Sequence, residues 1–519
     1  MLDIFDDDMR VQVRFTVVPG SAFTEGTAEF LADIEGPVIP WHEAEQRPFA
    51  LAIAASENGD LHRLNAPLIV LPHGAGRNKF AKPIGGRPPE VSGFTRRQLV
   101  RAGRVVPDAL VVSHANQLRQ LAEQVPEAHD RAVVAGDPCY DRIVASIPNR
   151  LEYRESIGIS DKQRLVVVSS TWGGYSLLEH LPELPARLLA ELPSDEFQVA
   201  AILHPAMWHR HGPWQVRKWL RTARESGLQL IPPREGWRAC AIAADWLIGD
   251  HGSVTLYGAA TGVPLLLAGF GDHEVVPGTP MADLGATAPR LDPTTELRPQ
   301  LEAVADAHRP GRYDPVVRDA FALPGESALA LRALAYRLMT LAPPPGAPAV
   351  RIVPPAQPEA TRVTAHLVHT DVRDREIHLR RYPAAQADAG ATDSWRRHLA
   401  VHADETDARL AETATVHLGR WAADRLRSYP GARLAAAPVA PRSWQIHVRD
   451  TGSLRLDVHG DVDPAIGPSA VHAWLTAHRD LGSLDGVEVV LGTRRATLRV
   501  TYRSSSARIS SAFGSPSTT

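Results

Sequence analysis

Short apolar runs alternate with amphipathic stretches along the first half of the chain. Runs of Val, Ile and Leu without polar interruption are typical of parallel strands that are covered on both faces. Their regular alternation with helical patterns indicates doubly wound α/β units. The pattern therefore predicts two α/β domains, with strands at 11–18, 49–54, 67–71, 109–113, 132–135, 164–170, 197–204, 228–231, 245–250 and 263–268.

The two sets of strands are separated near residues 142–162, where a helical pattern is followed by a polar segment. We therefore expect a first domain at 1–150 and a second at 160–340. Doubly wound domains usually begin with a strand and a ligand-binding turn, but here the first strand pattern starts only at Val11. Either the chain lacks the usual first strand of its first domain, or the first sheet is rearranged.

The rest of the chain has a different character. Residues 341–361 are rich in proline, which predicts an extended linker. Residues 362–503 suggest a small α+β module, and the Ser-rich residues 504–519 are expected to be disordered. Within the module we expect alternating polar and apolar residues at 362–380, a charged helical stretch at 393–428, a helix near 469–477, and further strand patterns at 444–459 and 487–502.

Composition and charge narrow the class of protein. Lys and Arg total 56 and Asp and Glu total 59, so the net charge is −3 and no basic excess points to nucleic acid. Two cysteines exclude a disulfide framework and a thiolate zinc site, which fits a reducing cytosol. An acidic start and the lack of any run of about 18 apolar residues argue against a signal peptide and a membrane span. We expect a cytoplasmic protein, with peripheral association at the inner face of the membrane left open.

The first motif that could carry chemistry is HGAGRNK at 73–79, directly after the strand pattern 67–71. Open α/β sheets bind ligands at the carboxyl ends of their strands, which is where His73 would stand. Gly74 and Gly76 would let the backbone approach a ligand closely. Lys79 is one of only four lysines in the chain, and its ammonium suits a phosphate. A glycine turn with a surface histidine and solvated lysines accounts for the same residues equally well.

A second histidine, in His204-Pro205, also stands at the end of a strand pattern. The proline that follows would end the strand and turn the chain. For this dipeptide taken alone, a histidine held in a loop by backbone hydrogen bonds is the slightly favoured interpretation. The nearby His209 and His211 have no carboxylate or cysteine partner in the sequence, so they are a weak signal for a metal.

The third motif is the most specific, because a strand pattern runs straight into the start of a helical pattern. We expect Ser253 to cap this helix, whose first-turn N–H groups would form an anion site. Capping alone explains Ser253, but it does not explain the polar residues before it. The motif consists of Asp250, His251, Gly252, Ser253 and Val254.

Other catalytic signatures are missing from the sequence. No lysine follows a glycine, so a P-loop is excluded. Neither a G-x-S-x-G nucleophile elbow nor an H-E-x-x-H zinc helix is present. The three motifs described above are therefore the ones left that could carry chemistry.

Taken in order, these motifs resemble those of GT-B-fold transferases, specifically the CDP-glycerol glycerophosphotransferase family. Residues 73–79 resemble its His-Gly-Thr-Pro-x-x-Lys loop, with Ala-Gly in place of Thr-Pro. His204-Pro205 resembles the family's His-Pro, and 249–253 its Thr-Asp-Tyr-Ser-Ser motif, with Gly in place of the first Ser. Residues 136–141 (GDPCYD) resemble the Gly-x-Pro-x-x-Asp turn that closes the first domain of many GT-B enzymes. The resemblance covers about residues 10–310.

This resemblance implies two Rossmann-like domains facing across a cleft, and a transferase that needs no metal or cofactor. It would move a glycerophosphate or glycosyl unit from a nucleotide-diphosphate donor to a hydroxyl acceptor in cell-envelope polymer synthesis. His73 would act as general base and His204 would stabilise the leaving phosphate. The residues expected to bind the donor phosphates are Gly74, Gly76, Lys79, Asp250, His251, Gly252, Ser253 and Val254.

Two alternatives stay open. Asp250-x-Gly is also similar to the Asp-Ser-Gly-Gly motif of UDP-N-acetylglucosamine 2-epimerases, which share the fold, so an epimerase-like enzyme is one. A nucleotide-binding protein without catalysis is the other. The acceptor would be a cell-envelope polymer or a lipid-linked precursor, and the module after residue 361 could bind a protein partner.

Overall fold

The computed structural model describes residues 2–19, 24–81, 89–386, 395–478 and 480–505. The chain divides into two compact units. The first unit holds both parallel sheets, and the second holds a closed barrel. The first unit consists of Met1–Leu184, Val199–Trp219 and Gln229–Glu359, and the second of Pro185–Gln198, Leu220–Leu228 and Ala360–Thr519.

The first sheet is parallel, and its strand order follows the sequence without reversal. The prediction of a doubly wound first domain is therefore wrong for the described strands. Residues 11–18 form no strand beyond a single bridge between Phe15 and Val38. None of these eight residues is buried, so the segment lacks the two covered faces of an inner strand. The strands, in sheet order, are β1 (Ala52–Ala54), β2 (Leu68–Val70), β5 (Ala109–Val112) and β6 (Ala132–Val134).

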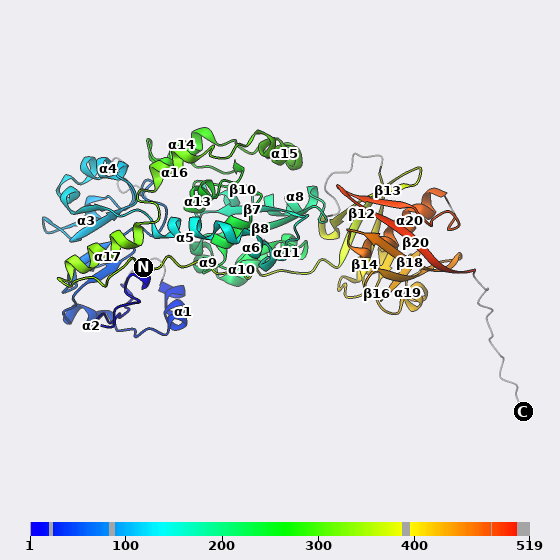
Figure 1. The fold of residues 1–519 in the computed structure, drawn as a ribbon, viewed down its shortest axis with the longest axis horizontal. Helices are drawn as coiled ribbons and strands as arrows, with labels where there is room; N and C mark the ends of the chain where they lie inside the picture. Colours follow the sequence, from blue (N-terminus) through cyan, green and yellow to red (C-terminus); the bar gives the residue numbers. More distant parts are fainter. Residues whose placement is uncertain (1, 20–23, 82–88, 387–394, 479, 506–519) are drawn as a thin grey trace, which may run out of the picture. The chain divides into compact units, whose positions relative to one another are not determined.

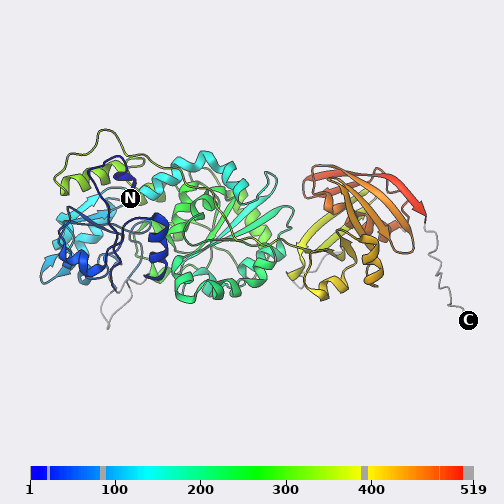
Figure 2. The ribbon, with the colours of Figure 1, turned by 90° about the horizontal axis from the view of Figure 1, so that it is seen from below.

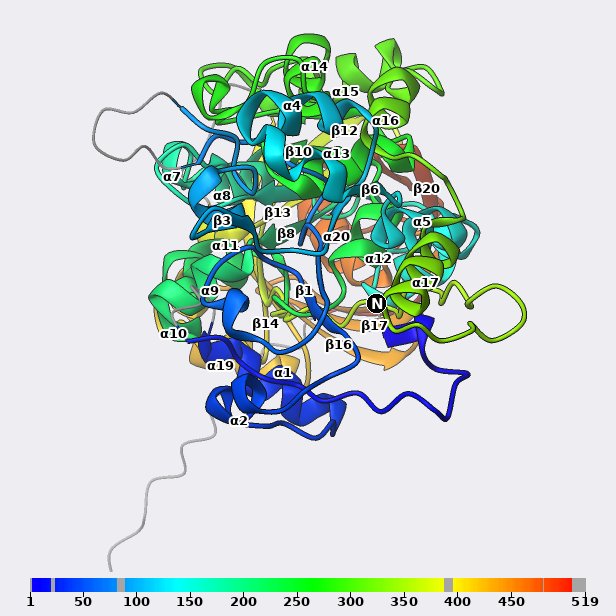
Figure 3. The same cartoon turned by 90° about the vertical axis from the view of Figure 1, so that its left-hand side faces the viewer.

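Alternate residues of the first sheet enter two separate cores. Ile69 and Val111 pack with the buried face of α17 (Ser327–Leu338), whereas Val70 and Leu110 pack with α4 (Asn116–Gln124) on the other side. A late segment of the chain thus returns to cover the first sheet. Figures 1 and 3 show the N-terminus beside α17. Arg332 of α17 fixes this arrangement by pairing with Asp7.

The second sheet has the strand order β11-β10-β7-β8-β9, all parallel. The chain builds from β7 to β9 in one direction and then returns to add β10 on the other side of β7. This reversal is the doubly wound arrangement that the sequence predicts, with its switch point between β7 and β10. Figure 2 shows helices on both sides of this sheet. Its strands are β7 (Arg164–Ser170), β8 (Phe197–Leu203), β9 (Gln229–Ile231), β10 (Trp246–Gly249) and β11 (Leu265–Leu267).

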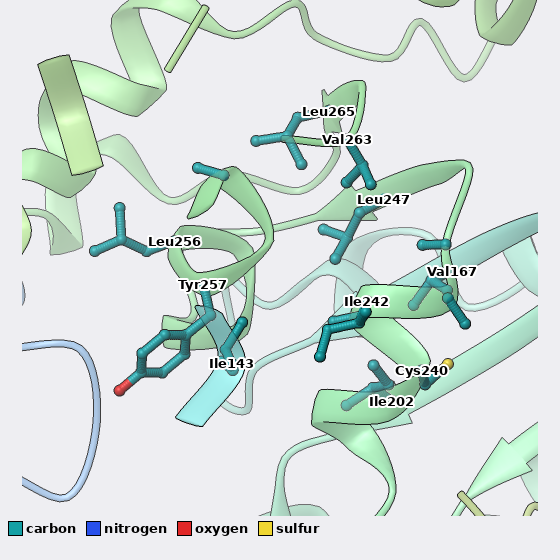
Figure 4. Packing of buried hydrophobic residues seen from close by; sticks show 14 of the residues in the cluster. Ile143, Val167, Ile202, Cys240, Ile242, Leu247, Leu256, Tyr257, Val263 and Leu265 are labelled. Atoms are coloured by element: carbon teal, nitrogen blue, oxygen red, sulfur yellow. The ribbon is translucent and has the colours of Figure 1, made fainter. Parts of the chain in front are cut away.

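One buried cluster joins this sheet to the helices that cover it (Figure 4). Small side chains of α12 (Trp237–Ala243) let that helix approach the strands closely, and five of its seven residues are buried. The remaining α-helices of the first unit are α1 (Thr24–Ile34), α2 (Trp41–Gln46), α3 (Arg96–Leu99), α5 (Pro138–Ser146), α6 (Arg150–Ser156), α7 (Leu177–His180), α9 (Pro205–His211), α10 (Pro213–Trp219), α13 (Ser253–Thr261), α14 (Pro280–Thr287), α15 (Leu297–Ala307) and α16 (Asp314–Ala320).

The proline-rich segment contains no helix or strand between residues 341 and 358, and part of it lies in the core. Val353 and Ala356 are buried in the same cluster as the second sheet. The Tyr153 hydroxyl donates a hydrogen bond to the Val353 carbonyl at 2.7 Å. Glu359 and Leu230 form an isolated antiparallel β-bridge. Residues up to Glu359 are therefore packed against the first unit rather than forming a free linker.

The second unit, for which the sequence suggests a small α+β module, is built around a closed nine-stranded barrel. The buried residues of α20 (Gly467–His478) lie in the same core as the strands' inner faces. The charged stretch near 393–428, expected to be helical, contains two strands and only two short helices, α18 (Ala408–Thr413) and α19 (Ala422–Ser428). The barrel order is β12 (Ala365–Arg373), β13 (Glu376–Pro383), β19 (Glu488–Leu491), β20 (Arg494–Ser505), β18 (Gly452–Gly460), β17 (Ser443–Val448), β16 (Leu434–Ala440), β15 (Val416–Leu418) and β14 (Arg396–His402).

Two earlier segments of the chain belong to this second unit. Arg381 of β13 pairs with Asp195 and with Asp463, and the Ser194 N–H donates to the Arg381 carbonyl at 2.9 Å. Of the tail expected to be disordered, residues 504 and 505 end β20, and 506–519 lie outside the described residues.

Candidate functional site

Asp250 organises the switch point of the second sheet. It follows β10 directly, it is fully buried, and its carboxylate accepts hydrogen bonds from the N–H groups of Thr171, Leu177 and Gly252 at 2.8–2.9 Å. Burial raises the pKa of Asp250 to about 6, although these donors and Lys79 oppose the shift. Asp250 therefore fixes the loop after β7 against the start of α13.

The helix α13 begins at Ser253, and Gly252 is its N-cap. The prediction that Ser253 caps this helix is wrong, because Gly252 occupies the N-cap position and Ser253 is the first helical residue. Its hydroxyl instead faces Gly74, where a Cβ would come within 2.7 Å of the Ser253 Oγ. Val254 packs against the core of the second sheet. The motif that follows β2 and the motif that follows β10 therefore meet at Gly74 and Ser253.

Lys79 reaches the same place from the first sheet. Its Nζ donates to the Thr171 hydroxyl at 3.3 Å. Burial lowers the pKa of the Lys79 ammonium, and the carboxylates of Asp250 and Glu274 oppose that shift. The backbone also joins the two segments, since Lys79 and Val275 form an antiparallel bridge. The structure thus brings Lys79 to the edge of the second sheet.

Other residues of the 73–79 loop hold its shape. Gly76 has a φ of +76°, and a Cβ at this position would lie 2.2 Å from the side-chain nitrogen Nε2 of Gln117. Glycine is therefore the residue that fits here. Arg77 is buried, pairs with Glu57 and lies over the Phe94 ring at 4.7 Å. The contacts of Gly76 and Arg77 hold the shape of the loop. Lys79 is the cation of this loop that faces the switch point.

His204 lies close to this loop and is neutral. Its Nδ1 accepts the Ala206 N–H at 3.1 Å, so the ring proton resides on Nε2. Burial, followed by the charges of Lys79, His73 and His209, lowers the pKa of His204 to about 4. His73 itself is exposed. The structure therefore brings His73, Lys79 and His204 into one neighbourhood.

His251 is buried and both of its ring nitrogens are engaged. Nδ1 accepts the Gly271 N–H at 3.2 Å, which leaves the proton on Nε2 to be donated to Glu274 at 2.7 Å. Burial, with Lys79 as the next cause, lowers the pKa of His251 to about 4. Glu274 could not be recognised from the sequence, because it ends the short helix Asp272–Glu274 and belongs to no motif. Its one signal is its place beyond the carboxyl end of β11.

A cavity of about 200 Å³ opens beside this cluster, at the carboxyl ends of β7 and β8. The Trp172 ring on its wall lies 6.2 Å from the His204 ring, centre to centre. Apolar side chains and glycines form most of its lining, and Glu179 and Arg210 add charges of opposite sign. The lining residues are Trp172, Gly173, Gly174, Ser176, Glu179, Ala206, Met207, Arg210 and His211.

The turn at 136–141 is a joint between segments rather than a part of this cluster. Asp137 caps α5 and accepts the Tyr257 hydroxyl at 2.7 Å, while Asp141 accepts the N–H groups of Gly325 and Ser327. In the described residues, no group of three or more His, Cys, Asp or Glu side chains could hold a metal ion. No helix in the described part of the chain is long and apolar enough to cross a membrane.

Comparison with known proteins gives distant structural likenesses. No protein-family model and no curated protein matches the sequence. A variant of the wall teichoic acid polymerase TagF is similar at a TM-score of 0.43 and 13% identity, over 65% of this chain and 85% of that chain. A glycosyltransferase from Rickettsia africae ESF-5 is similar at 0.36 and 13%, over 64% and 91%. WaaG, a glycosyltransferase involved in lipopolysaccharide biosynthesis, is similar at 0.27 and 15%, over 60% and 80%. These TM-scores assign no donor and no acceptor.

Proposed function

We propose that this chain is a transferase that moves a glycerophosphate or glycosyl unit from a nucleotide-activated donor to a hydroxyl acceptor. One geometric feature supports this function most directly. Gly74 and Lys79, which follow a strand of the first sheet, lie against Ser253 and Thr171 at the switch point of the second sheet. Doubly wound sheets bind ligands at that edge, and the first turn of a helix favours an anion.

The donor diphosphate would lie over the first turn of α13, with the Lys79 ammonium beside it. His204 would donate its Nε2 proton to a phosphate oxygen, since its Nδ1 is already an acceptor. A neutral donor fits the low pKa of His204, because the imidazole stays uncharged at neutral pH. Asp250 and His251 would hold the surrounding loops rather than touch the phosphates.

His73 is the exposed histidine of the cluster and would take the proton from the acceptor hydroxyl. The acceptor oxygen would form a bond to the donor's phosphorus or anomeric carbon, and the nucleotide would leave as its mono- or diphosphate. General-base assistance contributes roughly 10²- to 10⁴-fold to such a step. The acceptor we propose is a cell-envelope polymer or a lipid-linked precursor.

The test is turnover of labelled donors, CDP-glycerol and UDP-sugars, by the wild-type chain and by His73→Ala. We expect nucleotide release that falls at least about 100-fold in His73→Ala, while donor affinity changes little. His62→Ala is the matched control, because His62 is a histidine of the same unit in the separate turn Leu61–Arg63. Equal loss of donor binding and turnover in His73→Ala would contradict the base assignment.

Two outcomes would replace the proposed function. Release of a free sugar or an epimer without any acceptor would favour a UDP-sugar 2-epimerase-like enzyme. Nucleotide binding without turnover, equal in wild type and His73→Ala, would favour a non-catalytic nucleotide-binding protein.

A further inference from the structure

The helices α9 and α10 carry a cationic segment of the chain. Residues 205–219 contain one lysine, two arginines and two histidines, and no Asp or Glu. The whole chain has a net charge of −3, so this positive charge is a local feature. Figures 1 and 3 show the two helices beside one another in the first unit. A basic surface of this kind attracts an anionic partner.

One face of α10 is fixed to the protein. Val216 is buried on that face. The Arg217 guanidinium lies 5.8 Å from the ring centre of the buried Trp208, and it pairs with Glu359 at 2.6 Å. These contacts set the rotation of the helix and leave its other face turned outward.

The outward face of α10 presents two tryptophans and a lysine. Three tryptophans of the described residues are exposed, and two of them, Trp214 (70%) and Trp219 (53%), lie on this helix. At about 100° per residue, these two and Lys218 span an arc of roughly 140° on the side away from Val216. The Lys218 ammonium lies 5.0 Å from the Trp214 ring centre, and the Trp219 ring packs on His211 with 4.8 Å between ring centres. Single exposed apolar residues are common on protein surfaces, but two indoles among cations on one short helix form a patch.

We propose that α9 and α10 dock the first unit onto a lipid bilayer with anionic headgroups. Trp214 and Trp219 enter the boundary between water and acyl chains, which favours indole rings because they are apolar and carry one N–H donor. Lys218 and the exposed Arg210 contact the headgroup phosphates.

A bilayer fits this surface better than a nucleic acid or an acidic protein. Proteins that bind single strands stack the bases along a basic groove, whereas these indoles stand on the outer face of a helix. A protein partner would need a fitted pocket for each tryptophan, and a bilayer accepts both rings without one. Lysine and arginine next to tryptophan are typical of helices that lie in the bilayer interface.

The patch adjoins the cavity beside His204, because Arg210 and His211 also line that cavity. Docking would place the cavity near the headgroups, where a lipid-linked acceptor would reach it without leaving the bilayer. This last consequence rests on the function proposed above, whereas the docking itself does not.

Flotation of the purified chain with vesicles tests the docking. The vesicles contain phosphatidylglycerol and phosphatidylcholine in equal parts, and vesicles of phosphatidylcholine alone give the background. We expect the wild type to float with the anionic vesicles, and less so as salt screens the headgroup charge. In Trp214→Ala/Trp219→Ala the partition coefficient should fall at least about tenfold, since two large apolar side chains leave the interface. In Lys218→Gln it should fall about fivefold, as expected for the loss of one cation near such a surface.

Matched variants separate this patch from nonspecific adsorption. Trp421→Ala removes the third exposed tryptophan, which is 76% exposed and belongs to the second unit, and should float like wild type. Lys218→Arg keeps the charge and should also float like wild type. A brominated lipid in the vesicles should quench the tryptophan fluorescence of wild type and of Trp421→Ala alike. This quenching is measured on folded wild type, so the test does not depend on the stability of the double variant.

Three results would overturn the proposal: no flotation of wild type, equal partition of wild type and the double variant, or an equal loss in Trp421→Ala. Binding of single-stranded DNA or polyphosphate by wild type, without binding of anionic vesicles, would indicate a soluble polyanion instead and would also overturn it.

Calorimetry with CDP, UDP and GDP separates this proposal from the proposed function. If wild type floats through its two tryptophans but binds none of the three nucleotides, the docking stands and the proposed function fails. If a nucleotide binds wild type but the anionic vesicles do not, the proposed function stands and the docking fails.

Discussion

The contact between Gly74 and Ser253 can be tested by a double-mutant cycle. In Gly74→Ala the new Cβ would lie 2.7 Å from Ser253 Oγ, about 0.7 Å closer than the 3.4 Å at which ordinary contact begins. The φ of Gly74 is outside the left-handed region, so alanine adds the close contact without backbone strain. Such overpacking costs about 1–3 kcal/mol, and we expect the low end because the serine hydroxyl can rotate.

Ser253→Ala should by itself change stability by less than about 0.5 kcal/mol, because Gly252 and not Ser253 is the N-cap of α13. A true N-cap serine would cost about 1 kcal/mol when replaced by alanine. In the double variant the nearest remaining atom, Ser253 Cβ, lies at an ordinary 3.4 Å. The double variant should therefore regain most of the stability that Gly74→Ala loses, with a coupling free energy of about 1 kcal/mol.

Urea unfolding of the four proteins at pH 7.5, followed by tryptophan fluorescence, measures this coupling. The 11 tryptophans of the chain give the signal. Additive effects, with a coupling below about 0.3 kcal/mol, would refute the close approach of the two motifs. A loss of about 1 kcal/mol in Ser253→Ala alone would refute the assignment of Gly252 as the N-cap.

Two other changes have outcomes that the structure predicts. Gly76→Ala should lower the free energy of unfolding by about 2–4 kcal/mol, since it combines a left-handed φ with a 2.2 Å clash. Gly103 also has a left-handed φ, of +77°, but open space around it, so Gly103→Ala should cost only about 1–2 kcal/mol. Equal losses in the two variants would contradict the clash at Gly76. Burial, followed by the charge of Arg433, lowers the pKa of His472 in the barrel to about 4. As the pH falls from about 6.5 to 4, this histidine therefore binds a proton in the unfolded chain before it does so in the folded chain, and the barrel should lose stability. Urea midpoints across this range should show a loss of up to about 3 kcal/mol that is smaller in His472→Gln, and a flat profile in wild type would contradict the burial of this ring.

The second sheet could be predicted from the sequence because its information is local. Each strand from β7 to β11 is an apolar run followed by a turn, and the motif residues stand where those runs end. The reversal that makes β7 and β10 neighbours is a general property of such alternating patterns. This is why His204 and Asp250 could be placed at the ligand edge before any pairing was known.

The parts that could not be predicted depend on long-range pairing. Whether the first sheet reverses its order depends on which strands pair. The apolar pattern of residues 11–18 gives no sign that this segment pairs through a single bridge at Phe15 instead of forming a strand. The barrel joins strands that are far apart in the sequence, and β15 (Val416–Leu418) is too short to stand out in a charged stretch. Glu274 becomes recognisable only through its hydrogen bond with the His251 ring, which the fold brings to it.

The proposed function requires that the loop carrying Lys79 and the start of α13 form one site for a nucleotide diphosphate. The most direct test is calorimetric titration of wild type, Lys79→Met and Lys218→Met with CDP, UDP and GDP at pH 7.5. Lys218 is an exposed lysine of α10 whose ammonium lies 5.0 Å from the Trp214 ring centre. We predict that at least one nucleotide binds wild type and Lys218→Met alike and binds Lys79→Met at least tenfold more weakly. Equal affinity for Lys79→Met and wild type, or no binding of any of the three to wild type, would contradict the claim.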